Sequence, residues 1–134
     1  MRKGMIAAFL MIAVLTVAAC QSGPNLTAAP KSTPELKQTL SAGKKTIVFF
    51  LNPNGGPCQA QNGILQKLSQ DRGGNFNVAY VNAMQPENQQ AFYDYGVRSL
   101  PTLVLVDSAG KISRSFPPGI QAYETIAAAL DGTK

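Results

Sequence analysis

The sequence contains no histidine, and its only cysteines are Cys20 and Cys58. Without an imidazole, the chain cannot activate a cysteine through a Cys–His pair or bind zinc through histidine. Two cysteines so far apart cannot form a CxxC metal knuckle, so we expect no metal site and no cofactor. Charged residues make up only 14% of the chain and form no basic cluster larger than a pair such as Lys44 and Lys45. Nothing in this pattern indicates a nucleic-acid-binding surface, and we expect no nucleic-acid partner.

The first 19 residues have the composition of a secretory signal. Arg2 and Lys3 are basic, residues 4–17 are almost wholly apolar, and two alanines precede Cys20. Residues 17–20 resemble the bacterial lipobox, in which the bond before the cysteine is cut and the cysteine is lipidated. The resemblance implies a protein of the bacterial cell envelope, lipid-anchored through Cys20, with its domain facing the periplasm or the outer surface. The alternatives are an uncleaved membrane anchor and an ordinary signal. The apolar segment is short for a full membrane span, which needs about 20 residues.

Cleavage before Cys20 would leave ten basic and seven acidic residues, because Arg2 and Lys3 are lost, and the charge balance would be +3. An acylated Cys20 cannot form a disulfide, so Cys58 would be the one free thiol of the mature chain. Residues 20–33 are rich in Ser, Thr, Pro and Ala, and we expect them to be a flexible tether. The domain itself is expected at residues 34–134.

Hydrophobic patterns predict the order α, β, α, β, α, β, β, α in this domain. Ser32 and Glu35 have capping-box spacing ahead of a helix at residues 34–42. Continuous apolar runs predict buried strands at 47–51 and 103–106, and alternation predicts strands at 76–82 and 111–116. Helical spacing predicts helices over 59–69 and 87–95, and a last helix whose apolar face begins at Ile120.

The stretch from 51 to 58 places a thiol at a helix start. Unpaired N–H groups and the positive end of the helix dipole at this position both favour a thiolate. A pair of thiols would need a second cysteine three positions earlier, where the sequence has Gly55.

This element order, with Gly56-Pro57-Cys58 after the first central strand and Pro101 opening a later one, resembles the thioredoxin family. The resemblance covers about residues 34–130 and implies the thioredoxin fold, an α/β architecture with a central mixed sheet flanked by helices. It further implies that Gly56, Pro57 and Cys58 match the last three positions of the family's Trp-Cys-Gly-Pro-Cys motif, and that Pro101 is its cis proline. Cys58 is then the expected catalytic residue, and the expected substrate-binding residues are Pro101, Leu100, Gly56 and Pro57.

The departures from the family pattern concern its chemistry. The family's attacking cysteine aligns with Gly55, its tryptophan with Asn54, its buried aspartate with Phe49 and a nearby lysine with Tyr80. Cys58 matches the resolving thiol, which normally breaks a mixed disulfide formed by the first cysteine.

Two hypotheses therefore stay open. The first is a thioredoxin-like thiol–disulfide oxidoreductase that acts through Cys58 alone on protein or small-molecule thiols and disulfides. The second is a non-catalytic module that binds extended peptides or a partner protein beside Pro101. In both cases we expect a monomer.

Overall fold

The computed structural model describes residues 26–134. The predicted signal segment and the lipidation site Cys20 lie outside the described residues. The elements are α1 (Pro34–Leu40), β1 (Lys45–Leu51), α2 (Gly56–Arg72), β2 (Phe76–Asn82), a short 3-10 helix (Pro86–Asn88), α3 (Gln89–Asp94), β3 (Thr102–Val106), β4 (Ile112–Ser115) and α4 (Tyr123–Asp131).

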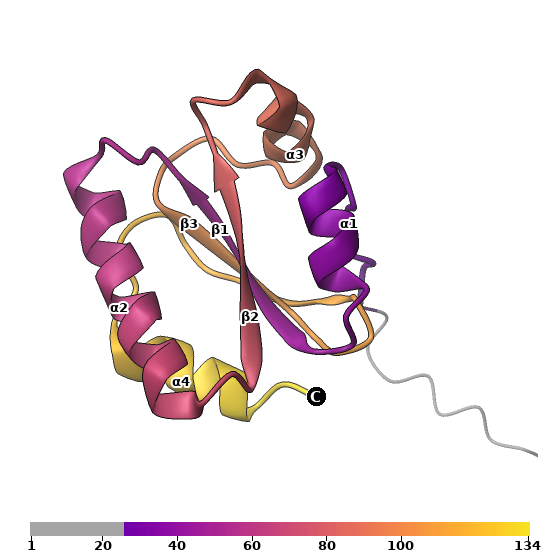
Figure 1. Ribbon diagram of the computed structural model, residues 1–134, viewed down its shortest axis with the longest axis vertical. Helices are drawn as coiled ribbons and strands as arrows, with labels where there is room; N and C mark the ends of the chain where they lie inside the picture. The colour runs from indigo at the N-terminus through magenta and orange to yellow at the C-terminus, as the bar shows by residue number, and fades with distance from the viewer. Residues whose placement is uncertain (1–25) are drawn as a thin grey trace, which may run out of the picture.

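The four strands form one mixed sheet in the order β2-β1-β3-β4. β1 pairs in parallel with β2 and antiparallel with β3, and β4 pairs antiparallel with β3. Figure 1 shows α2 and α4 on one side of the sheet and α1 and α3 on the other. The prediction of a thioredoxin fold with a central mixed sheet between helices is confirmed.

Strand β1 lies at the centre of the sheet, and its side chains supply both cores. Ile47 and Phe49 belong to the cluster beneath α2 and α4, whereas Val48 and Phe50 belong to the cluster beneath α1 and α3. All four are fully buried. Because successive side chains of a strand point to opposite faces, a continuous apolar run fits a strand covered on both sides.

The N-terminal ends of α1 and α4 differ from the sequence predictions. Thr33, not Ser32, caps α1, and its hydroxyl accepts a hydrogen bond from the Leu36 N–H at 3.1 Å. The Ser32 hydroxyl instead donates to the Asp94 carboxylate on α3. Ile120 lies ahead of α4 and is 49% exposed, because that helix begins only at Tyr123.

Residues 27–33 pack on the domain, although their composition suggested part of a tether. Ala28 pairs with Lys111, the Thr27 carbonyl accepts from the Ile112 N–H at 2.7 Å, and Ala29 is 4% exposed. The Tyr95 hydroxyl also donates to the Pro30 carbonyl at 2.8 Å. Residues 27–33 are therefore packed against the domain.

Within residues 26–134, no helix has the length and apolar character that crossing a membrane requires.

Candidate functional site

A short loop after β1 brings Cys58 to the start of α2. The Asn52 carbonyl accepts from the Gly55 N–H at 2.9 Å, and its side-chain oxygen accepts from the Asn54 N–H at 3.0 Å. The side chain of Asn52 therefore forms a local turn of the kind that asparagine favours. Pro57 occupies the first turn of α2, where its missing N–H costs nothing. The helix begins at Gly56, three residues earlier than the apolar pattern alone predicts.

The thiol of Cys58 is held beneath this loop. Cys58 is 3% exposed and joins the core cluster that contains Phe49 and Leu65. Its Sγ accepts a hydrogen bond from the Asn52 N–H at 3.4 Å. Cys58 forms no disulfide. The thiol thus combines a position in the first helical turn with an N–H donor, while packing limits access from solvent.

Gly55 leaves a small space beside the sulfur. The backbone of Gly55 is extended, with φ of −83°, so a side chain could be carried there without strain. A Cβ at this position would lie 3.7 Å from the Cys58 Sγ and 3.3 Å from the Asn52 carbonyl oxygen. The first of these is an ordinary contact, and the second requires a small shift of the loop.

An aromatic pair occupies the positions at which the family resemblance expects an aspartate and a lysine. The rings of Phe49 and Tyr80 lie 5.8 Å apart between centroids, with Phe49 fully buried and Tyr80 38% exposed. The Tyr80 hydroxyl donates to the Asn62 side chain at 3.1 Å, and burial raises the pKa of Tyr80. Neither ring can relay a proton to or from Cys58 near neutral pH.

The second part of the site is the turn before β3. The peptide bond between Leu100 and Pro101 is cis, and the Pro101 carbonyl accepts from the Gly119 N–H at 2.9 Å. Gly119 has φ of 114°, a conformation that favours glycine. Leu100 packs against the core cluster that contains Cys58. Since Thr102 pairs with Phe50 near the end of β1, the Pro101 turn and the Cys58 loop lie at the same end of the sheet.

A buried glutamine that sequence reasoning missed ties this end together. Gln61, on α2, is fully buried, and its Oε1 accepts from the Gln121 N–H at 2.6 Å while its Nε2 donates to the Gln121 carbonyl at 3.3 Å. The Gln121 side chain in turn donates to the Pro117 carbonyl at 2.8 Å. The loop that bonds Pro101 is therefore fastened to the helix that carries Cys58. A polar residue inside an otherwise apolar helical stripe was the one available signal.

The predicted site residues thus divide by exposure. Cys58 and Pro101 are buried, Leu100 is half-buried, and Gly56 and Pro57 are exposed. In the described part of the chain, no three Cys, Asp or Glu side chains gather in a way that could hold a metal ion.

Comparison with known proteins places this geometry in a family. The model of a thioredoxin-like domain matches residues 33–134. Thioredoxin 1 from Nostoc sp. is 30% identical over 76 residues, which are 57% of this chain and 69% of that protein. The solution structure of an uncharacterised thioredoxin-like protein from Clostridium perfringens superposes with a TM-score of 0.63 at 25% identity, covering 68% of this chain and 71% of that one. A malarial protein shares the fold, with a TM-score of 0.59 at 17% identity over 67% of this chain and 97% of its own. The chain belongs to the thioredoxin-like family.

Proposed function

We propose that this protein is a thiol–disulfide oxidoreductase of the bacterial cell envelope that works through the single thiol of Cys58. Membership of the thioredoxin-like family supports a thiol–disulfide oxidoreductase type of function in general. The proposal adds which sulfur reacts, how the reaction is completed and where the protein is held.

The observation that carries the proposal is the setting of the Cys58 sulfur. It lies in the first turn of the 17-residue helix α2 and receives the Asn52 N–H at 3.4 Å. Cysteines in the first turn of a helix are the positions at which many proteins hold a reactive sulfur, and the thiolate is the form that attacks disulfides. Gly55, which lies beside the Cys58 sulfur, has no side chain to cover it.

The exchange takes two balanced steps. The Cys58 thiolate attacks one sulfur of a substrate disulfide, a Cys58–substrate disulfide forms, and the other substrate sulfur leaves as a thiolate. A second, external thiolate, such as that of a small thiol, then attacks the substrate sulfur of the mixed disulfide. Cys58 is released as a thiolate, and the external thiol ends in a new disulfide with the substrate. Cys58 is thus the attacking thiol, and the external thiol takes the place of the resolving thiol that a dithiol enzyme carries in its own chain.

Access to the sulfur requires the loop above it to move. Cys58 is 3% exposed, and residues 52 and 55 of the loop lie against its sulfur: the Asn52 N–H bonds it at 3.4 Å, and a Cβ at Gly55 would be 3.7 Å from it. The exposed residues Gly56 and Pro57 border this loop. A substrate that pairs in extended form beside Leu100 and Pro101 would displace the loop as it binds.

Thiol labelling of the full chain tests this function. We expect the native protein to react with a maleimide at neutral pH and to form a mixed disulfide with oxidised glutathione, which a free thiol then reverses. Cys58→Ser removes the reaction, and its hydroxyl keeps an acceptor for the Asn52 N–H, so the loop stays in place. Labelling that occurs only after denaturation would refute a reactive Cys58.

A non-catalytic binding module is the second candidate, and the aromatic pair of Phe49 and Tyr80 favours it. This pair supplies no proton transfer beside a thiol that is almost fully buried. Such a module would bind an extended peptide beside Pro101 through backbone hydrogen bonds. Its peptide affinity, measured by calorimetry, is expected to be the same for wild type and Cys58→Ser. A large loss of affinity in that variant would count against this candidate.

The envelope location is part of the same proposal and has its own test. The support is the sequence of residues 17–20, with Cys20 as the residue that would be acylated. Cells grown with a labelled fatty acid should yield a labelled wild-type protein in the membrane fraction and an unlabelled Cys20→Ala variant. Incorporation of label into neither protein would overturn the lipid anchor.

A further inference from the structure

The end of the domain opposite Cys58 gathers its basic side chains. This end, called the basal end below, consists of the turn before β1, the turn after α2, the hairpin between β3 and β4, and the residues after α4. Its parts touch: the Lys44 Nζ donates to the Gly74 carbonyl at 3.3 Å, and the Ser108 N–H donates to the Lys134 carbonyl at 3.0 Å. Lys31 reaches it through a 3.3 Å hydrogen bond to Ser41.

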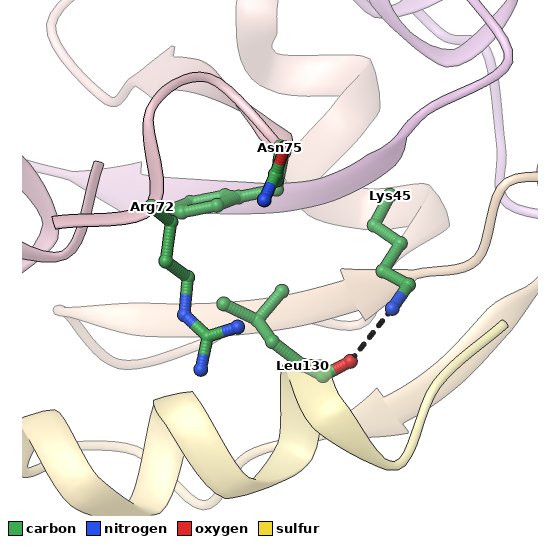
Figure 2. Close-up of a pocket in the computed structure, with 5 residues that line it drawn as sticks. Lys45, Arg72, Asn75 and Leu130 are labelled. Atoms are coloured by element: carbon green, nitrogen blue, oxygen red, sulfur yellow. Dashed lines mark hydrogen bonds between the residues drawn. The ribbon is translucent and has the colours of Figure 1, made fainter. Parts of the chain in front are cut away.

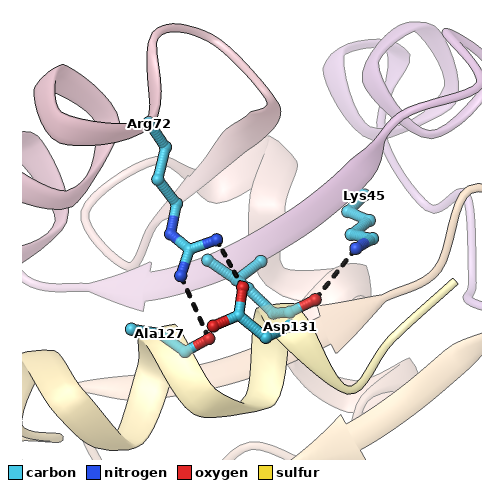
Figure 3. Close-up of polar contacts among 5 residues, drawn as sticks. Lys45, Arg72, Ala127 and Asp131 are labelled. Atoms are coloured by element: carbon cyan, nitrogen blue, oxygen red, sulfur yellow. Dashed lines mark hydrogen bonds and ion pairs between the residues drawn. The ribbon is translucent and has the colours of Figure 1, made fainter.

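Two of these cations hold the last turn of α4. Lys45 donates to the Leu130 carbonyl at 2.9 Å. Both residues line a cavity of about 260 Å³, together with Arg72, Asn75 and Phe76 (Figure 2). Arg72 pairs with Asp131 at 2.7 Å and donates to the Ala127 carbonyl at 3.3 Å (Figure 3). Cations at a helix C-terminus stabilise its unpaired carbonyls. The lysines around them are exposed to solvent.

The net charge of the domain is concentrated at this end. Six of its side chains are basic and two, Asp107 and Asp131, are acidic, whereas the rest of residues 26–134 carries four basic and five acidic side chains. Lys67 and Asp71 pair with each other, so the imbalance does not depend on which end they are assigned to. The basic set comprises Lys31, Lys44, Lys45, Arg72, Lys111 and Lys134.

The described chain also begins at the basal end. Leu26 lines a hollow with Asp107, Gly132 and Lys134, and the carbonyl of the next residue, Thr27, bonds the hairpin at Ile112. Figure 1 shows the start of the described chain and the C-terminus toward the end of the sheet where β1 begins. Only six peptide units separate Leu26 from Cys20. Fully extended, they span at most about 20 Å.

We propose that the basal end is a docking surface for anionic phospholipid headgroups, which holds the domain upright with Cys58 directed away from the bilayer. The inference rests on the lipid anchor at Cys20 proposed above. A tether of at most about 20 Å keeps Leu26 near the headgroups, and a domain of about 100 residues has a radius of gyration of about 13 Å. A tether of this length lets the basal lysines approach the membrane to within the distance of about 10 Å over which surface charges act in salt. Each lysine near an anionic membrane surface adds to the attraction.

The orientation has a consequence for the site. Strand β1 runs from Lys45 at the basal end to Leu51 before the Cys58 loop. Its seven residues, at about 3.3 Å each, hold the loop about 20 Å farther from the membrane. The site is then presented to soluble proteins or small molecules rather than to lipid.

Lysine footprinting of the full lipidated chain on vesicles tests the docking surface. The protein is bound to vesicles of phosphatidylcholine alone or of phosphatidylcholine with phosphatidylglycerol, and amine acetylation is followed residue by residue by mass spectrometry. Lys44 and Lys111 are expected to react about fivefold more slowly on the anionic vesicles. The exposed Lys67 on α2 serves as the internal reference and is expected to react equally on both. High salt should abolish the difference.

A matched pair of charge variants completes the test. Lys31→Gln/Lys44→Gln/Lys111→Gln should lose the protection of Lys45 and Lys134 on anionic vesicles, whereas Lys37→Gln/Arg98→Gln/Arg114→Gln, which has the same change in charge and keeps the reference Lys67, should keep it. Equal labelling of the basal lysines on both vesicles, with the protein sedimenting with both, would overturn the docking surface and leave the anchor standing. Sedimentation with anionic vesicles alone, with basal protection, would overturn the anchor and support the surface. Sedimentation with neither would overturn both.

Discussion

Substituting Gly55→Cys should create a Cys-Gly-Pro-Cys site that closes into a disulfide with Cys58. A Cβ at position 55 lies 3.7 Å from the Cys58 Sγ, and bonding requires it to approach to about 3 Å. Its 3.3 Å contact with the Asn52 carbonyl opposes this slightly. Closing a loop of four residues restricts the unfolded chain by about 2 kcal/mol. We therefore expect the oxidised variant to unfold at higher urea concentration than the reduced one.

The new pair of thiols should nevertheless reduce disulfides slowly. Position 49 holds a fully buried phenylalanine, so no carboxylate can accept the proton of Cys58 when it resolves a mixed disulfide. A positioned acid or base typically contributes a factor of about 10² to 10⁴ to a rate. Insulin reduction, followed as turbidity with dithiothreitol as the electron donor, should therefore run at least about 100-fold below that of a thioredoxin with the complete motif.

Two controls isolate the contribution of each thiol. Gly55→Ser has similar bulk without sulfur and should show no activity above the wild type. Gly55→Cys/Cys58→Ser has the attacking thiol without the resolving one and should accumulate mixed disulfides. If Gly55→Cys matched the complete thioredoxin in rate, the reasoning about Phe49 would be wrong.

Three further perturbations address the framework of the site. Gln61→Leu leaves the Gln121 N–H and carbonyl without their side-chain partners and should lower the free energy of unfolding in urea by about 1 to 3 kcal/mol; an unchanged midpoint would show that the loop does not depend on this contact. Phe49→Asp buries a carboxyl group and raises its pKa, so stability measured by urea should be low at pH 7 and recover as the carboxyl is protonated at lower pH; equal losses at both pH values would point to cavity formation instead. Burial raises the pKa of Tyr95 well above its usual value near 10, so the folded state keeps a proton that the unfolded state loses. Wild-type stability should therefore fall as the pH rises above about 10, and the fall should be smaller in Tyr95→Phe.

The central strands and their order could be predicted because their sequences leave few alternatives. The run from Ile47 to Leu51 is apolar at every position, and such a run fits the middle of a sheet covered on both faces. Glycines at positions 43, 73 and 96 mark the ends of the helices, and Pro101 marks the start of β3. Family resemblance supplied the position of the cis proline, which the sequence pattern alone does not reveal.

Features that depend on tertiary partners could not be predicted. Ser32 and Thr33 are both favourable caps by type. Thr33 caps α1, while Ser32 bonds Asp94, a residue 62 positions away in sequence. Gln61 interrupts an apolar helical stripe, but the sequence does not reveal its partner, the Gln121 backbone. Local propensity carries no information on contacts of this kind.

The pair of Phe49 and Tyr80 also bears on how this branch of the family could change over time. Acquiring dithiol chemistry would require a thiol at position 55 and a carboxylate at position 49. A carboxylate at position 49, introduced before the thiol, places an unpaired acid in a fully buried site. It lowers the stability of the fold before it can contribute to a rate. A thiol at position 55 alone gives a slow enzyme. The two changes therefore contribute fully only together, and the apolar core beneath Cys58 is an evolutionary barrier between this chain and a fast dithiol enzyme.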